Sequence, residues 1–245
     1  MNDFQKLYEE YHCKDLFDNF GEGTFQGEIA EQSYPNTLSV LDFGCGNGYA
    51  VKKMREVGKN WFGLEYSKTA FERYLGDSYF FHGTTTQFND RQFDMGYSTD
   101  VFEHIPEEII DETIADFCRV IDRYLFMTIS LRPSSDNNKY HCTLKPRAWW
   151  EKKFLDNGFV LDQNVIYAHQ PRTIKTTKQI LCCYSHFGPA VEEFAKNPPY
   201  ELKGEREQYF FCFHRKGATP PITPKPSKTW ANRKVIPLIR KLLLR

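Results

Sequence analysis

No run of apolar residues in this sequence approaches the roughly 20 needed to span a bilayer. The first 15 residues are too charged for a signal peptide. These absences favour a cytoplasmic location. The seven cysteines are scattered, odd in number and without a C-x-x-C pair, which indicates reduced thiols and argues against a structural zinc site. With 245 residues, 40% hydrophobic and 26% charged, the chain is expected to fold into one or two globular domains.

Acidic residues are also absent from the C-terminal part of the chain. None follows Glu207, whereas nine lysines and arginines lie between Arg215 and Arg245. Because the whole chain has zero net charge, the first 214 residues carry a net charge of −9. The tail ends in a basic segment rich in leucine, a composition that is compatible with peripheral contact with an anionic membrane surface. The alternatives are that the tail packs on the acidic body or stays disordered. A nucleic-acid partner is disfavoured because the body is acidic.

Short apolar stretches alternate with helical patterns through the middle of the chain. The expected strands are 38–43, 60–65, 78–83, 93–99, 124–130, 159–168 and 208–215. The expected helices are 3–18, 49–57, 68–75, 107–121 and 146–157, and residues 20–28 are expected to be a glycine-rich loop. Single helices between strands indicate right-handed βαβ units. The predicted fold is therefore α/β, a Rossmann-like, doubly wound sheet of seven strands, mostly parallel with an antiparallel last strand.

The same pattern suggests how the chain is organised. Residues 1–37 are expected to form an N-terminal helical cap, and residues 38–215 the main domain. Within that domain, residues 169–207 are an insertion with basic and aromatic side chains, which we interpret as a lid over an acceptor site. Residues 216–245 are expected to be a proline-rich linker followed by the basic tail.

The stretch VLDFGCGNGYA, residues 40–50, carries the strongest functional signal. A strand leads into Gly44, Gly46 and Gly48, and a helical pattern follows, which is the layout of a ligand cradle at a helix N-terminus. Asp42 at the strand end would repel a pyrophosphate but suits a ligand with an ammonium group. Glu65, at the end of the next strand, can accept both hydroxyls of a ribose. A glycine triplet alone also fits a nicotinamide or flavin domain.

The order VLDFGCGNG, GLE and FDMGYSTDVFEHIP resembles the class I S-adenosylmethionine-dependent methyltransferases over residues 38–160. The resemblance implies that S-adenosylmethionine is the cofactor, that the three glycines line its loop and that Glu65 holds its ribose. Near strand three, where the family often has an acidic adenine contact, this chain has Thr84 and Thr85 instead. Ser98 and Asp100, at the tip of strand four, would flank the methionine end of the cofactor.

The acceptor side is expected beyond strands four and five, where open α/β sheets bind ligands. His141 is the first candidate for a general base and His104 the second; the alternative for each is a structural hydrogen bond. Glu103 is interpreted as a helix-start carboxylate that complements the dipole. The pattern H-x-T-x-K-P-x-x-W-W, which begins at His141, has a weaker similarity to bacterial and phage methyltransferases associated with sugars and cell-surface polymers.

These features together predict a methyltransferase that methylates an oxygen of a small molecule or glycan. Two other functions stay open. One is a non-catalytic, methyltransferase-like binding module that docks through its basic tail. The other is an N-methyltransferase, although the NPPY of such enzymes is missing after strand four and occurs here only at 197–200. No metal is expected, because the DNN at 136–138 offers only one acid.

Overall fold

The computed structural model describes residues 6, 9, 24–131, 140–162, 165 and 210–221. Most of the helix predicted at 3–18, all of the insertion at 169–207 and most of the tail lie outside the described residues. So do most of the loop residues that follow strand five, 132–139. Within the described part of the chain, no helix is both long enough and apolar enough to cross a membrane.

Seven strands form one sheet in the order β3-β2-β1-β4-β5-β7-β6. The first five are β1 (Val40–Phe43), β2 (Trp61–Glu65), β3 (Phe80–His82), β4 (Phe93–Thr99) and β5 (Ile121–Thr128), and all pairs among them are parallel. The last two are β6 (Phe159–Leu161) and β7 (Phe210–Arg215), and β7 is antiparallel to both of its neighbours. The predicted fold class and the antiparallel last strand are therefore confirmed.

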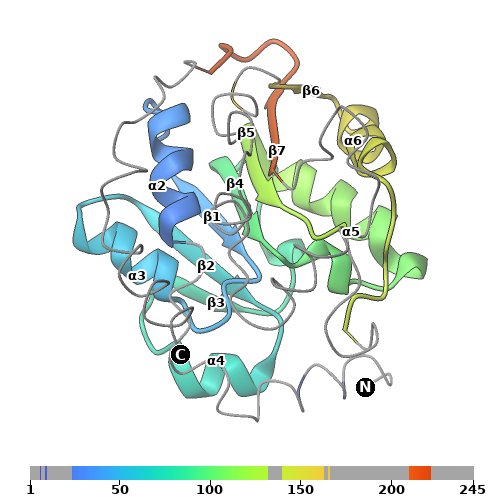
Figure 1. Cartoon of the computed structure of the whole chain (residues 1–245). Helices are drawn as coiled ribbons and strands as arrows, with labels where there is room; N and C mark the ends of the chain where they lie inside the picture. Colours follow the sequence, from blue (N-terminus) through green and yellow to red (C-terminus); the bar gives the residue numbers. More distant parts are fainter. Residues whose placement is uncertain are drawn as a thin grey trace, which may run out of the picture.

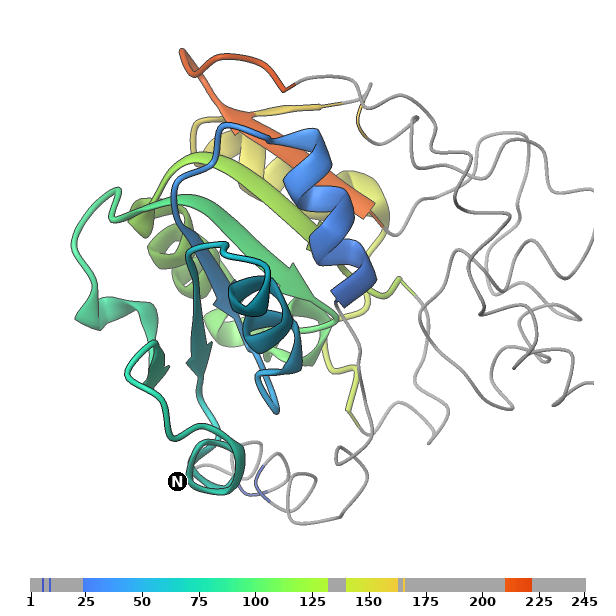
Figure 2. The same cartoon turned by 90° about the vertical axis from the view of Figure 1, so that its left-hand side faces the viewer.

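Helices cover both faces of the sheet (Figures 1 and 2). One face packs against α2 (Thr24–Ser33) and α3 (Tyr49–Glu56), and the other against α5 (Glu107–Val120) and α6 (Arg147–Asp156). The short α4 (Lys68–Tyr74) lies beside β2 and β3. Two 3-10 turns, η2 (Thr85–Gln87) and η3 (Phe102–His104), follow β3 and β4. Covering both faces explains why the central strands are apolar throughout.

The helices follow the expected amphipathic pattern. In α5 the buried residues recur at helical spacing and include Ile110, Ile114 and Phe117. Glu107 and Glu108 occupy its first turn, where a negative charge complements the helix dipole. The helix ends at Val120 and the chain enters β5 at the next residue, so β5 begins three residues before the predicted strand.

Two predictions about local structure are wrong. Helix α2 spans residues 24–33, so residues 24–28 of the predicted glycine-rich loop are helical. Gly27 is buried in that helix because it packs on the Trp61 ring, where an added Cβ would lie 3.0 Å from a ring carbon. The indole nitrogen of Trp61 also donates to Glu31, 2.7 Å away, which ties α2 to the sheet. The strand predicted at 159–168 ends at Leu161, and Asp162 then turns inward.

Candidate active site

The glycine loop connects β1 to α3, and its backbone is in a left-handed conformation at all three glycines. Gly44, Gly46 and Gly48 have positive φ angles of 75°, 55° and 70°, a region that favours glycine. A Cβ at Gly44 would lie 2.6 Å from the Val101 side chain, so this glycine is needed for close packing. A Cβ at Gly46 would meet nothing within 4 Å. The loop thus leaves open space beside Gly46, where a ligand can approach the backbone.

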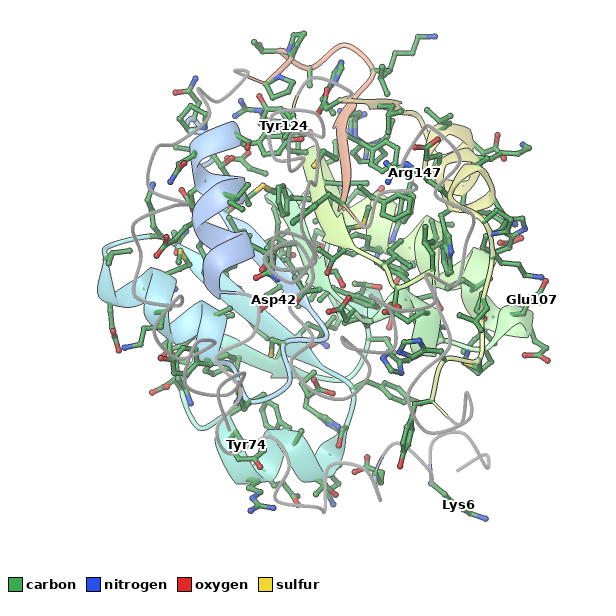
Figure 3. The ribbon with its side chains drawn as sticks, viewed as in Figure 1. Lys6, Asp42, Tyr74, Glu107, Tyr124 and Arg147 are labelled. Carbon is green, nitrogen blue, oxygen red and sulfur yellow. The ribbon has the colours of Figure 1, made fainter. Side chains whose placement is uncertain are left out.

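The carboxylates of Asp42 and Glu65 lie at the ends of β1 and β2, beside this loop. Asp42 is 3% exposed and Glu65 2% exposed. Glu65 accepts hydrogen bonds from the backbone nitrogens of Gly46 at 2.8 Å and Ser67 at 2.7 Å, so it holds the loop and the start of α4 together. Figure 3 labels Asp42 near the centre of the molecule.

Burial shifts the acidity of both groups. It raises the pKa of Glu65 to about 7, although backbone N–H groups of Ser67, Gly46 and Tyr66 pull in the opposite direction. Burial, and then the neighbouring Glu65 charge, raise the pKa of Asp42 well above its usual range. Two buried acids side by side are unfavourable without a cation. The pair is therefore suited to a positively charged ligand.

The next strand tip belongs to β4, which lies beside β1. The Ser98 hydroxyl is fully buried and donates to the Phe43 carbonyl at 2.9 Å, so it joins the two tips. Asp100 follows with a positive φ of 54°, which is strained for a residue with a side chain. It is held by hydrogen bonds with Thr128 of β5, from its own backbone nitrogen and to its carboxylate. The strand order reverses between β1 and β4, which is where open α/β sheets form their ligand crevice.

The threonines after β3 lie farther along the same edge. Thr84 is exposed and its hydroxyl is 2.7 Å from that of Thr86. Thr85 is buried and donates to Asp116 of α5, so its side chain has a structural role. Of this pair, only Thr84 remains a candidate for an adenine contact.

The two candidate bases come together beyond β4 and β5. The rings of His104 and His141 are perpendicular, with centroids 4.7 Å apart. His104 Nδ1 lies 2.9 Å from the Tyr140 carbonyl. The sequence placed these histidines 37 residues apart in two separate loops, and the fold makes them neighbours.

Glu103 lies in the first turn of the short 3-10 helix η3, not at the start of α5. Helix α5 begins only at Glu107, and Glu103 is fully buried. Its Oε1 accepts a hydrogen bond from the Ser130 backbone nitrogen at 2.8 Å, just after β5. A ligand atom of Glu103 also lies within 4.8 Å of those of His104 and His141. Sequence reasoning missed this group of three, because its members come from two loops that are far apart in the chain and meet through contacts between residues 103–105 and 140–143.

The fold and the glycine loop agree with the class I methyltransferase architecture that the sequence predicted. Residues 41–125 match the family model described as Methyltransferase domain. The chain is 30% identical over 127 residues to a malonyl-[acyl-carrier protein] O-methyltransferase from Buchnera aphidicola subsp. Baizongia pistaciae (strain Bp), a match covering 48% of this chain. The chain spans about half the length of that curated relative, 50%. The family-model match and this relative support a class I S-adenosylmethionine-dependent methyltransferase.

Two solved structures share the fold. One comes from the complex between the Haloferax volcanii Trm112 methyltransferase activator and a methyltransferase, with a TM-score of 0.55 and 15% identity, covering 87% of this chain and 97% of that chain. The other is a SAM-dependent methyltransferase from Archaeoglobus fulgidus, with a TM-score of 0.52 and 13% identity, covering 84% and 99%.

S-adenosylmethionine is the cofactor of this class, as the sequence predicted. The glycine loop and the two buried acids fit this cofactor in two respects. The space beside Gly46 admits a ligand close to the backbone. The buried pair of Asp42 and Glu65 offers negative charge to a molecule that carries both an ammonium and a sulfonium group.

Proposed function

We propose that this chain transfers a methyl group from S-adenosylmethionine to an oxygen of a small-molecule or glycan acceptor. The observation that carries the proposal is the position of His104 and His141. Their rings are in contact, His104 follows β4 and His141 follows β5, and β4 lies beside β1, which leads into the glycine loop. The cofactor supplies an activated methyl group, so the chain has to align the acceptor and take up its proton.

Each predicted residue has a role in this proposal. Gly44, Gly46 and Gly48 shape the loop, Glu65 accepts the ribose hydroxyls and Asp42 faces the cationic end of the cofactor. Ser98 and Asp100 fix the β4 tip, and Thr84 is the candidate at the adenine end. His141 is the first candidate for the group that handles the acceptor hydroxyl, with His104 beside it.

An oxygen acceptor is supported by the O-methyltransferase name of the curated relative. Two kinds of oxygen are chemically distinct here. A hydroxyl must lose a proton during transfer, whereas an ionised carboxylate has none to lose. Loss of the histidine pair should therefore stop transfer to a hydroxyl and spare transfer to a carboxylate.

The test begins with calorimetry of the full chain and S-adenosylmethionine. We expect saturable binding, and its absence would favour a non-catalytic module. The second step incubates the protein with cofactor labelled in the methyl group and with a panel of polyols, carboxylic acids, soluble glycans and amines. Label on a hydroxyl or carboxylate supports the proposal. Label only on the amines would show an N-methyltransferase instead.

A further inference from the structure

The cluster of Glu103, His104 and His141 has the composition of a metal centre. One ligand atom from each residue lies within 4.8 Å of the other two. Glu103 is fully buried, His141 is 8% exposed and His104 is half-buried. A carboxylate and two imidazoles, brought together from two loops, form the kind of three-ligand set that leaves one position of a metal ion open.

Backbone contacts hold the two loops together independently of any ion. The Thr143 backbone nitrogen donates to the Glu103 carbonyl at 3.0 Å, and the Thr143 hydroxyl donates to the Ile105 carbonyl at 2.6 Å. The Cys142 thiol contacts the His104 carbonyl at 3.1 Å. These bonds fix residues 103–105 beside residues 140–143, so the cluster is a feature of the fold.

The outer contacts of the cluster orient its ligand atoms. The Tyr140 carbonyl can only accept, so His104 Nδ1 must carry the hydrogen in their contact. In neutral His104 the coordinating lone pair is then on Nε2. Metal-binding histidines commonly donate their second ring nitrogen to a backbone carbonyl in this way. Glu103 Oε1 is likewise oriented by the Ser130 backbone nitrogen, as ligating carboxylates usually are.

We propose that Glu103, His104 and His141 bind one divalent transition-metal ion. Two imidazole nitrogens and a carboxylate oxygen suit Zn²⁺, Co²⁺, Fe²⁺ or Mn²⁺, whereas Ca²⁺ prefers a shell of oxygens. A divalent ion would also balance the charge of the buried Glu103 carboxylate and bind all three side chains. The expectation of no metal considered only residues 136–138.

The ion gives the site a second way to activate the acceptor, and this half of the inference rests on the proposed function. An acceptor hydroxyl at the open position would lose its proton to solvent more readily. A lone pair of the acceptor oxygen then forms the new bond to the methyl carbon. The electrons of the broken S–C bond stay on sulfur, which becomes a neutral thioether. In the metal-bound protein His104 and His141 are ligands, and the ion takes over the role assigned above to a histidine base.

Cobalt binding tests the site itself. The full chain is treated with a chelator, dialysed and titrated with Co²⁺ while its visible absorption is followed. We expect one equivalent to bind, with the spectrum of a mixed nitrogen and oxygen site. His104→Ala, His141→Ala and Glu103→Gln should each weaken binding at least about tenfold. His82→Ala is the matched control, because His82 is exposed on β3, and it should bind like the wild type.

Unchanged Co²⁺ affinity and spectrum in the His104 and His141 variants would overturn the site. Melting temperature shows whether each variant is folded, and His104→Gln and His141→Gln replace any alanine variant that is not. Cofactor calorimetry separates the two proposals. A chelated protein that binds cofactor and keeps full transfer to a hydroxyl overturns the role of the ion but leaves the methyltransferase intact. A protein that binds Co²⁺ as expected but no cofactor keeps the metal site and loses the proposed function.

Discussion

Glu65 has a structural role and a proposed binding role. It holds the glycine loop through Gly46 and the start of α4 through Ser67, and it is proposed to accept the ribose. Removal of the carboxylate in Glu65→Ala takes away hydrogen bonds to a charged group, worth about 1.5–3 kcal/mol each. We expect cofactor affinity to fall by about 10- to 100-fold, measured by calorimetry. Glu72→Ala on the exposed face of α4 is the control and should leave the affinity unchanged.

The pKa of Glu65 adds a pH dependence to cofactor binding. Burial raises this pKa to about 7, so the ligand-free protein carries a growing share of protonated Glu65 below that pH. The ionised form accepts hydroxyls and attracts a cation better. The dissociation constant should therefore rise as pH falls from 8 to 6, by at most about tenfold per pH unit. In Glu65→Gln this slope should become shallower, because Asp42 is then the only acid of the pair that ionises, and an equal slope in that variant would mean that Glu65 is not responsible.

At the scale of elements, β4 and α5 approach each other closely at Gly96. A Cβ there would lie 2.5 Å from the Phe117 ring and 2.9 Å from Ile121. Because Phe117 and Ile121 are fully buried, neither can move aside cheaply. Gly96→Ala should lower the free energy of unfolding by about 1–3 kcal/mol in denaturant titrations.

Gly76→Ala is the matched substitution at a position with open space. Nothing lies within 4 Å of its added Cβ. Reduced freedom of the unfolded chain should leave this variant as stable as the wild type or up to about 1 kcal/mol more stable. Equal losses in the two variants would show that the contact with Phe117 is not the cause.

The start of α4 provides a further prediction. Glu9 accepts hydrogen bonds from the backbone nitrogens of Lys68 and Thr69, at 2.9 and 3.0 Å, and from the Ser67 hydroxyl at 2.9 Å. It thus caps the helix that follows Glu65. Glu9→Ala should cost about 0.5–2 kcal/mol of stability, which a shift in melting temperature would measure. A melting temperature unchanged relative to the wild type would contradict this cap, and Lys6→Ala serves as the control.

The elements that the sequence predicted are those whose pattern is local. The prediction was within two residues at each end for six elements: α3, α5, α6, β1, β2 and β4. The spacing of apolar residues and the glycine turns that define these elements lie within a few residues of one another.

Helix α2 was missed because its glycine content indicated a loop, and only the packing of Gly27 on Trp61 shows why a helix tolerates it. The buried environment of Glu103 was missed for a similar reason, because its hydrogen-bond partner Ser130 is 27 residues away in the chain. Contacts between distant strands are not encoded in local spacing.

At the scale of the whole molecule, the proposed cofactor site contains two buried acids that lower the stability of the ligand-free protein when they are ionised. Asp42 and Glu65 are buried side by side, and the raised pKa of each means that the folded state holds protons that the unfolded chain releases. Folding stability from these groups is therefore fully present below about pH 4. It declines as pH rises through the window between their ordinary values, about 3.9 and 4.3, and their raised values in the folded state.

Asp42→Asn tests this relation between stability and function directly. Without cofactor at pH 8, the variant no longer contains an acid whose ionised form is disfavoured by burial and by Glu65. It should be more stable than the wild type, and the difference should shrink towards pH 4. Cofactor affinity should nevertheless fall, because the amide does not attract the cationic end of the ligand. Denaturant titrations at several pH values and calorimetry measure the two effects. A variant that is less stable at pH 8 and binds cofactor normally would show that Asp42 is a structural residue. A ligand-binding acid, in contrast, is expected to lower the stability of the ligand-free protein and to strengthen the complex.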